Sequence, residues 1–173
     1  MKKNFVPILT MPDSRAVVIN TTPLIALSIA TGSIEVLRKL YDRVIVTYEV
    51  QQEILAGGKQ SVGVAAFISS QWLERLPEPQ PIPDYLNNTL DPGEASVIHA
   101  ALENNIKRVC IDEKVGRRIA RLNGLKVTGS IGILAKAKQQ GYHLNIDKAL
   151  TRLRNHGIWL GKDVEQFLRN TEK

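Results

Sequence analysis

The stretch AVVINTTPLIAL, residues 16–27, carries the pattern that decides the fold. Its first part is a short apolar run, which predicts a buried parallel strand at residues 16–20. A turn at Asn20 follows, and then a helical pattern, for which we expect Thr22 as the N-cap and Pro23 as the first helical residue. A buried strand that runs directly into a helix is typical of the crossover units of α/β folds.

The rest of the chain repeats this alternation. Three further apolar runs predict buried strands, at residues 43–47, 108–112 and 125–128. Helical patterns lie between the strands, near residues 23–30, 33–40, 49–56, 92–104, 114–122 and 130–140. The proline-rich segment 77–83 predicts an extended surface connection. The alternation as a whole predicts an α/β sandwich.

Length and composition predict one globular domain. The chain has 173 residues, 43% hydrophobic and 23% charged, which fits a single folded core better than a disordered chain. We expect a solvated N-terminal tail at residues 1–15, with Met11 as an alternative start, and one domain over residues 16–173. Two short helices at about residues 143–173 are expected to form a C-terminal appendage to that domain.

Targeting signals and cysteine content predict a cytoplasmic protein. No apolar run approaches the ~20 residues that a membrane helix needs. The apolar part of the N-terminal segment is short and is interrupted by Pro7, so it makes a poor signal peptide. Cys110 is the single cysteine; this excludes an internal disulfide or a cysteine-based zinc cluster, and its apolar strand predicts a small buried side chain. The formal net charge of +6 favours a polyanionic partner such as nucleic acid or an acidic protein.

Acidic and amide side chains follow the predicted strands or open the helices after them. In open α/β sheets, ligands bind beyond the carboxyl ends of the strands, so we expect these side chains to converge there. Oxygen ligands of this kind suit Mg²⁺ or Mn²⁺ and suit zinc poorly. Such a metal site activates water and neutralises charge on a phosphodiester. The candidates are Asn20, Glu49, Glu53, Asp91, Glu94, Asp112 and Glu113.

Helix capping offers another explanation for several of these acids. Asp91-Pro92-Gly93-Glu94 has the form of a capping box, with Asp91 as the N-cap and Glu94 three residues later. Glu49 suits a helix N-terminus through the helix dipole. Position by itself therefore favours a capping role over a ligand role for Glu94, and a helix-dipole role for Glu49.

The remaining acids differ in how strongly their position suggests a site. Glu53 lies past the first helical turn, which leaves it open between solvent and a site. Asp112 ends an apolar run and is the strongest single candidate, although it is also placed to cap the next helix. Glu113 is expected to point away from Asp112, onto the surface.

Basic residues follow Asp112 along one face of the next predicted helix. The spacing of Lys114, Arg117 and Arg121 places them on one stripe. The stripe is either an ordinary solvated face or, beside a metal site, a place where phosphates bind. Ser130, in the segment GSIG, is expected to be an N-cap, and no dinucleotide or Walker A glycine motif is present.

Several sequence blocks in the same order resemble the PIN-domain family, and in particular a prokaryotic PIN-like subgroup. The resemblance covers residues 16 to the C-terminus. The blocks are VVINTTPLIAL (17–27), VTYEVQQEIL (46–55), LDPGEASVIHAAL (90–102), CIDEKVGRRIARLNGLKVTGSIGIL (110–134) and LRNHGIWLGKDVEQFL (153–168).

The resemblance implies a three-layer α/β/α sandwich with a central parallel sheet, and a ribonuclease that depends on Mg²⁺ or Mn²⁺. It also implies the toxin of a toxin–antitoxin pair, with RNA as substrate, an antitoxin protein as partner and a homodimeric assembly. Carried over by motif, the family site falls on Asn20, Glu53, Glu94 and Asp112, with the metal held by Glu53, Glu94 and Asp112. The resemblance thus selects Glu53 over Glu49 and a ligand role over a capping role for Glu94.

Asn20 departs from the family pattern, because most PIN nucleases have aspartate there. An amide oxygen can still bind Mg²⁺, but as a neutral dipole it attracts the ion less than a carboxylate. This leaves an alternative function, a PIN fold that binds nucleic acid or a protein partner without cutting. A phosphotransferase of the haloacid dehalogenase type needs an aspartate nucleophile after the first strand, a role that Asn20 cannot serve.

Overall fold

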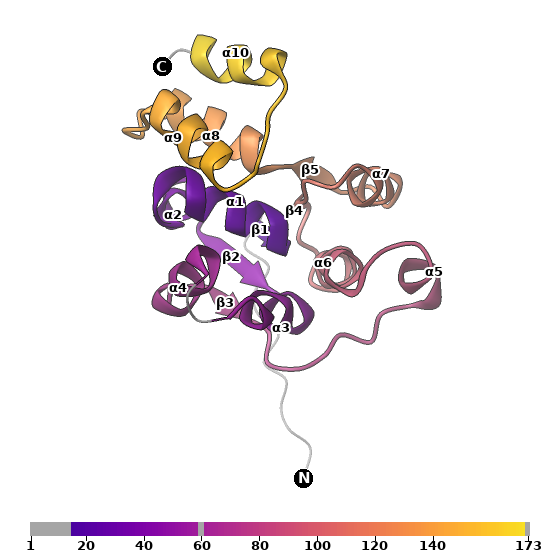
Figure 1. Cartoon of the computed structure of the whole chain (residues 1–173). Helices are drawn as coiled ribbons and strands as arrows, with labels where there is room; N and C mark the ends of the chain where they lie inside the picture. The colour runs from indigo at the N-terminus through magenta and orange to yellow at the C-terminus, as the bar shows by residue number, and fades with distance from the viewer. Residues whose placement is uncertain (1–14, 59–60, 172–173) are drawn as a thin grey trace.

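A parallel β-sheet forms the centre of the molecule. The computed structural model describes residues 15–58 and 61–171, and Figure 1 shows how the elements are arranged. Five strands form one sheet within these residues, and every neighbouring pair is parallel. They are β1 (Ala16–Ile19), β2 (Arg43–Val46), β3 (Glu74–Arg75), β4 (Arg108–Cys110) and β5 (Lys126–Thr128), in the order β3-β2-β1-β4-β5.

The central strand, β1, is buried along its whole length. Val17, Val18 and Ile19 have no exposed surface, as expected for a parallel strand that helices cover on both faces. β1 pairs with β2 on one side and with β4 on the other, where Ile19 lies opposite Cys110. The chain builds outward from β1 to β3 and then returns to β4, so the strand order reverses between β1 and β4. Ligands bind at such reversals, beyond the carboxyl ends of the strands.

Helices flank the sheet, which confirms the predicted three-layer α/β/α sandwich. α6 packs over β1 and β4, and α2 packs against β2; α1 packs against α4, α8 and α9. In Figure 1 the strands run between α8 and α9 above and α3 and α6 below. The helices are α1 (Thr21–Thr31), α2 (Glu35–Leu40), α3 (Tyr48–Ala56), α4 (Val62–Ser69), α5 (Asp84–Asn87), α6 (Pro92–Glu103), α7 (Lys114–Leu122), α8 (Ser130–Gln139), α9 (Ile146–Asn155) and α10 (Lys162–Asn170).

Two predicted helix caps are wrong. α1 begins at Thr21 with Asn20 as its N-cap, so Thr22 is already helical. α8 begins at Ser130 with Gly129 as its N-cap. Both boundaries lie beside a tertiary contact: the Asn20 amide donates to Glu113, and the Ser130 N–H donates to Asp112.

Three elements were not predicted from the sequence: β3, α4 and α5. β3 contains two residues, and a bidentate ion pair between Arg43 and Glu74 joins it to β2 at 2.7 and 2.8 Å. α4 is apolar over most of its length and therefore lacks a clear helical alternation. α5 is a single turn. The predicted extended connection at residues 77–83 is confirmed.

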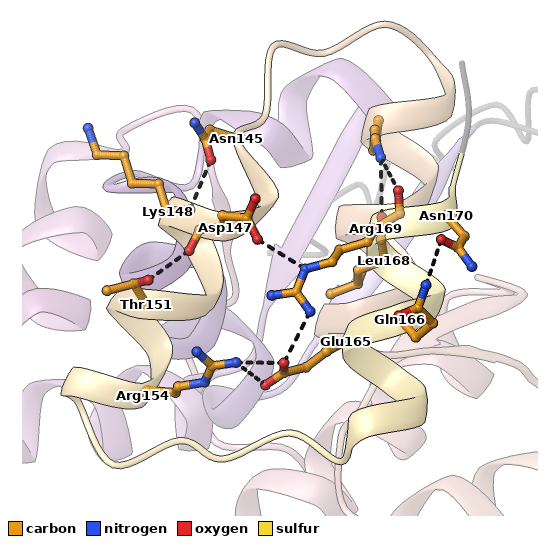
Figure 2. Close-up of polar contacts among 11 residues, drawn as sticks. Asn145, Asp147, Lys148, Thr151, Arg154, Glu165, Gln166, Leu168, Arg169 and Asn170 are labelled. Carbon is orange, nitrogen blue, oxygen red and sulfur yellow. Dashed lines mark hydrogen bonds and ion pairs between the residues drawn. The ribbon is translucent and has the colours of Figure 1, made fainter.

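A polar network holds the C-terminal helices together (Figure 2). Arg154 of α9 donates to both carboxylate oxygens of Glu165 in α10. Arg169 donates to Asp147 at 3.0 Å, and Lys138 of α8 donates to the backbone carbonyl of Arg169 at 3.0 Å. The two helices are therefore connected to each other and, through Lys138, to α8.

The N-terminal tail expected at residues 1–15 lies outside the described residues except for Arg15, which forms an ion pair with Asp42 at 2.8 Å. Within residues 15–58 and 61–171, the helices are all too short or too polar to cross a membrane.

The contact between α1 and α4 depends on a glycine. A Cβ at Gly63 would lie 2.7 Å from Cγ1 of Ile25 and 3.6 Å from its Cα. We expect Gly63→Ala to lower the free energy of unfolding by roughly 1–3 kcal/mol, because overpacking outweighs the better helix propensity of alanine. Urea unfolding measures this change.

The matched control is Gly161→Ala, where a Cβ would meet no atom of the described chain within 4 Å. It should be nearly neutral. A Gly63→Ala protein as stable as the wild type would contradict the close packing of these helices.

Candidate functional site

Two neighbouring strands end side by side at the point where the strand order reverses. The backbone N–H of Asn20, directly after β1, donates to the carbonyl of Cys110 at the end of β4, at 3.0 Å. On the other side of β4, the Ile111 N–H donates to Thr128 O at 3.0 Å. The side chains that follow β1 and β4 therefore leave the sheet at one edge, beside the start of α6, which packs on both strands.

Asn20 is buried, with 3% of its surface exposed. Its Nδ2 donates to Oε2 of Glu113 at 3.4 Å. Its Oδ1 is fully buried and accepts no hydrogen bond from any described residue. A buried polar atom without a partner costs about 1–3 kcal/mol, so this oxygen calls for an explanation.

Glu53, on α3, lies close to Asn20. Thr21 Oγ1, at the start of α1, donates to Glu53 Oε2 at 2.8 Å. A Cβ at Gly93 would lie 2.6 Å from Glu53 Oε2 and 3.1 Å from Asn20 Oδ1. Glu53 and Asn20 therefore converge on the first turn of α6, and the space between them exists because residue 93 has no side chain.

The two glutamates of α3, Glu49 and Glu53, contact different parts of the molecule. Thr47 caps α3, and its hydroxyl is 2.7 Å from that of Ser96 in α6. Glu49 lies in the first turn of α3, and its Oε1 accepts a hydrogen bond from the Gln80 N–H at 2.7 Å. Glu49 is thus held by the extended connection, whereas Glu53 lies at the edge of the sheet.

Glu94 is the most deeply buried acid of the site, with 6% of its surface exposed. The predicted N-cap is confirmed, because Asp91 Oδ1 accepts from the Glu94 N–H at 2.8 Å. The Glu94 carboxylate itself presses against α7, since Glu94 Oε1 occupies the place of a Cβ at Gly116. Burial raises the pKa of Glu94 to about 7, and the charges of Asp91 and Glu113 act in the same direction.

Asp112 is directed toward α8. Its Oδ1 accepts from the Ser130 N–H at 2.7 Å, so it does cap a helix, but not the next one along the chain. Burial raises the pKa of this carboxyl, and the hydrogen bonds from Ser130 partly oppose the shift. A Cβ at Gly129 would lie 2.6 Å from Asp112 Oδ1. Asp112 therefore borders the site from the α8 side.

The prediction that Glu113 is a surface residue is wrong. It is partly buried, accepts the hydrogen bond from Asn20, and carries a charge that acts on Glu94. The prediction assumed that side chains keep alternating past Asp112. The chain instead turns at Glu113, which is the N-cap of α7, so the alternation ends there.

The three residues of the predicted basic stripe differ in their exposure to solvent. Lys114 and Arg121 are exposed. Arg117 is partly buried, and its Nη1 donates to the carbonyl of Ile111 at 2.8 Å. Lys114 and Arg121 face solvent, whereas Arg117 braces the end of β4 beside Asp112.

Sequence reasoning assigned Glu113 to the surface and missed the glycines that the carboxylates approach. Gly93 and Gly116 lie in the first turns of α6 and α7, where glycine is unfavourable for a helix. An isolated glycine inside a helical pattern often has a packing or functional reason. That signal was present in the sequence, but it does not identify the carboxylate that approaches each glycine.

The side-chain oxygens at this edge are of the kind that coordinates a divalent cation. Glu94 Oε1, like Asn20 Oδ1, is buried without a partner in the described chain, and carboxylate and amide oxygens suit Mg²⁺ and Mn²⁺. Across residues 15–58 and 61–171, however, no three His, Cys, Asp or Glu side chains already lie close enough together to hold an ion. Glu53 and Asp112 are instead engaged by Thr21 and Ser130.

Comparison with known proteins identifies the fold family. A family model described as PIN domain matches residues 16–173, which is the whole of the chain beyond the N-terminal segment. A search of curated proteins found no match.

The buried carboxyl of Glu94 makes stability depend on pH. Its pKa in the folded protein is about 7, above the ordinary 4.5, so the folded state binds more protons than the unfolded state between these values. Stability therefore falls as the pH rises through this window. In metal-free protein we expect Glu94→Gln, which stays neutral, to raise Tm by a few degrees at about pH 8 and to change it little at about pH 5.

Thermal melts across this pH range measure the effect. Glu103→Gln, at the exposed end of α6, is the matched control and should show no such pH dependence. A difference in Tm between Glu94→Gln and the wild type that stays constant with pH would contradict the burial of an ionisable group here.

Proposed function

Since this chain belongs to the PIN-domain family, whose fold is of the nuclease type, we propose that it is a ribonuclease that depends on Mg²⁺ or Mn²⁺. One observation carries the proposal. Asn20 Oδ1 and Glu94 Oε1, near the point where the strand order reverses, are both buried and have no hydrogen-bond partner in the described part of the chain. Unsatisfied buried groups are costly and call for an explanation, and a bound ion would supply one for two oxygens that lie at this edge.

Each residue of the site has a proposed role. Glu53, Glu94 and Asp112 would hold the metal, and the neutral oxygen of Asn20 would complete the set. The metal, when bound, would activate water and neutralise charge on the phosphodiester. The exposed side chains of Lys114 and Arg121 would bind phosphates of the RNA backbone, and Arg117 would keep the end of β4 in place through its bond to Ile111.

The alternative function is binding of nucleic acid or a protein partner without cleavage. Asn20 favours it, because the site has an amide where a carboxylate would attract the cation more strongly. The engagement of Glu53 by Thr21 and of Asp112 by Ser130 also favours it, since metal binding would have to compete with those hydrogen bonds. The toxin role, the antitoxin partner, the homodimer and the cytoplasmic location stay predictions.

An RNA cleavage assay separates the two functions. We expect the purified chain to cut RNA with Mg²⁺ or Mn²⁺ and not with EDTA. Asp112→Ala and Glu94→Gln should each lower the rate on the order of a hundredfold or more, because even the outer-shell partners of metal ligands are worth about 10–100-fold. Glu103→Gln, which lies away from the site, should cut like the wild type.

Cleavage that is unchanged in Asp112→Ala and Glu94→Gln would defeat the proposal. A wild-type chain that binds RNA but does not cut it with either metal would establish the alternative.

Gly93→Ala tests the space between Asn20 and Glu53 without changing any charge. The new Cβ would lie 2.6 Å from Glu53 Oε2 and 3.1 Å from Asn20 Oδ1. A ligand that binds only the folded state raises Tm, so we expect Mn²⁺ to stabilise the wild type and to stabilise Gly93→Ala much less. Thermal melts with and without Mn²⁺ measure this, and Gly161→Ala, where a Cβ has open space among the described residues, is the control. Equal stabilisation of Gly93→Ala and wild type would place the metal elsewhere.

A further inference from the structure

We propose that Glu113 supplies the site with the carboxylate that Asn20 lacks, and that the Asn20 amide orients it. This inference rests on the proposed metal-dependent function and adds a residue to its site. The Asn20 Nδ2 donates to Glu113 Oε2 at 3.4 Å, across 93 positions of the sequence. Asn20, directly after β1, is thus hydrogen-bonded to the charged side chain of Glu113, the N-cap residue of α7.

The chemistry of this pair explains why residue 20 is an amide. A hydrogen bond to Glu113 needs a donor, which an asparagine amide has and an ionised carboxylate lacks. Aspartate at position 20 would instead place a second negative charge against Glu113 in a buried setting, where like charges repel strongly. The Asn20–Glu113 pair therefore carries the charge of a single carboxylate.

Glu113 contacts Asn20 and acts electrostatically on Glu94, the two residues of the site that keep an unpaired oxygen. Asn20 and Glu94 are 97% and 94% buried, as their exposed fractions of 3% and 6% show, and each keeps one oxygen without a partner in the described chain. The charge of Glu113 acts on Glu94 as well. Glu113 thus interacts with both residues that keep an unpaired oxygen at this edge.

Capping does not account for this placement. Glu113 is the N-cap residue of α7, but within the part of the chain that the structure describes its side chain accepts no hydrogen bond from that helix. The carboxylate turns from the helix N–H groups toward Asn20 instead. Its role is therefore directed at the edge of the sheet and not at the start of α7.

Calorimetric titration with Mn²⁺ alone tests the ligand role. We expect Glu113→Gln to weaken Mn²⁺ binding by about tenfold or more. The reversed pair, Asn20→Asp with Glu113→Gln, has the same charge and the same two side-chain lengths, so it should recover the wild-type affinity to within about threefold. Glu103→Gln, on the exposed end of α6, should bind Mn²⁺ like the wild type.

The outcomes of this titration are distinct. Mn²⁺ affinity that needs Glu94 but is unchanged in Glu113→Gln would overturn this inference and leave the proposed function standing. A wild-type chain that binds no Mn²⁺ would overturn the metal-dependent function together with it.

A thermal-melt cycle in EDTA tests the pairing without metal. Asn20→Asp should lower Tm by several degrees in the wild-type background, because it places two carboxylates in contact, and by much less in the Glu113→Gln background. The two side chains are isosteric with the originals, so the cycle isolates charge and hydrogen bonding. Equal losses in both backgrounds would overturn the pairing.

Discussion

The backbone hydrogen bond from the Asn20 N–H to the Cys110 carbonyl extends the pairing of β1 and β4 to the very end of both strands. The strand order reverses at this pair, so the chain leaves β1 toward α1 and leaves β4 toward α7 from neighbouring points. The residues after the two strands therefore leave the sheet at one shared edge. At this edge Asn20 contacts Glu113, and α6 packs over both strands.

Close approach to the backbone shapes the rest of the site. Glu94 presses against Gly116, and Glu53 lies beside Gly93. A Cβ at either glycine would overlap a carboxylate oxygen, so the carboxylate would have to move. Removed from water, the Glu94 carboxyl has its pKa raised to about 7, so the fold holds this acid at a cost in stability. Protein cores normally avoid that cost, and a bound cation would relieve it.

Regular elements were predicted well where a local pattern is enough to specify them. The strand at 16–20 and the helix at 114–122 are short, strongly patterned segments, and the structure contains both, to within one residue. β3 was missed because it contains two residues and is joined to β2 by an ion pair from Arg43, which lies far away in the sequence. The caps at Thr22 and Ser130 were each misjudged by one or two residues, and distant side chains contact both regions: Glu113 contacts Asn20, and Asp112 accepts from the Ser130 N–H.

For the site, the sequence by itself determined which oxygen-bearing side chains stand at the ends of strands, because strand periodicity and chain direction are local properties. It also placed an amide at position 20. The tertiary structure decided how these side chains are used: Glu53 rather than Glu49 at the edge, Asp112 turned to α8, and Glu113 turned inward to Asn20. The physical reason is that these choices depend on contacts between segments tens of residues apart, which only the packing of crossover helices on the sheet brings together.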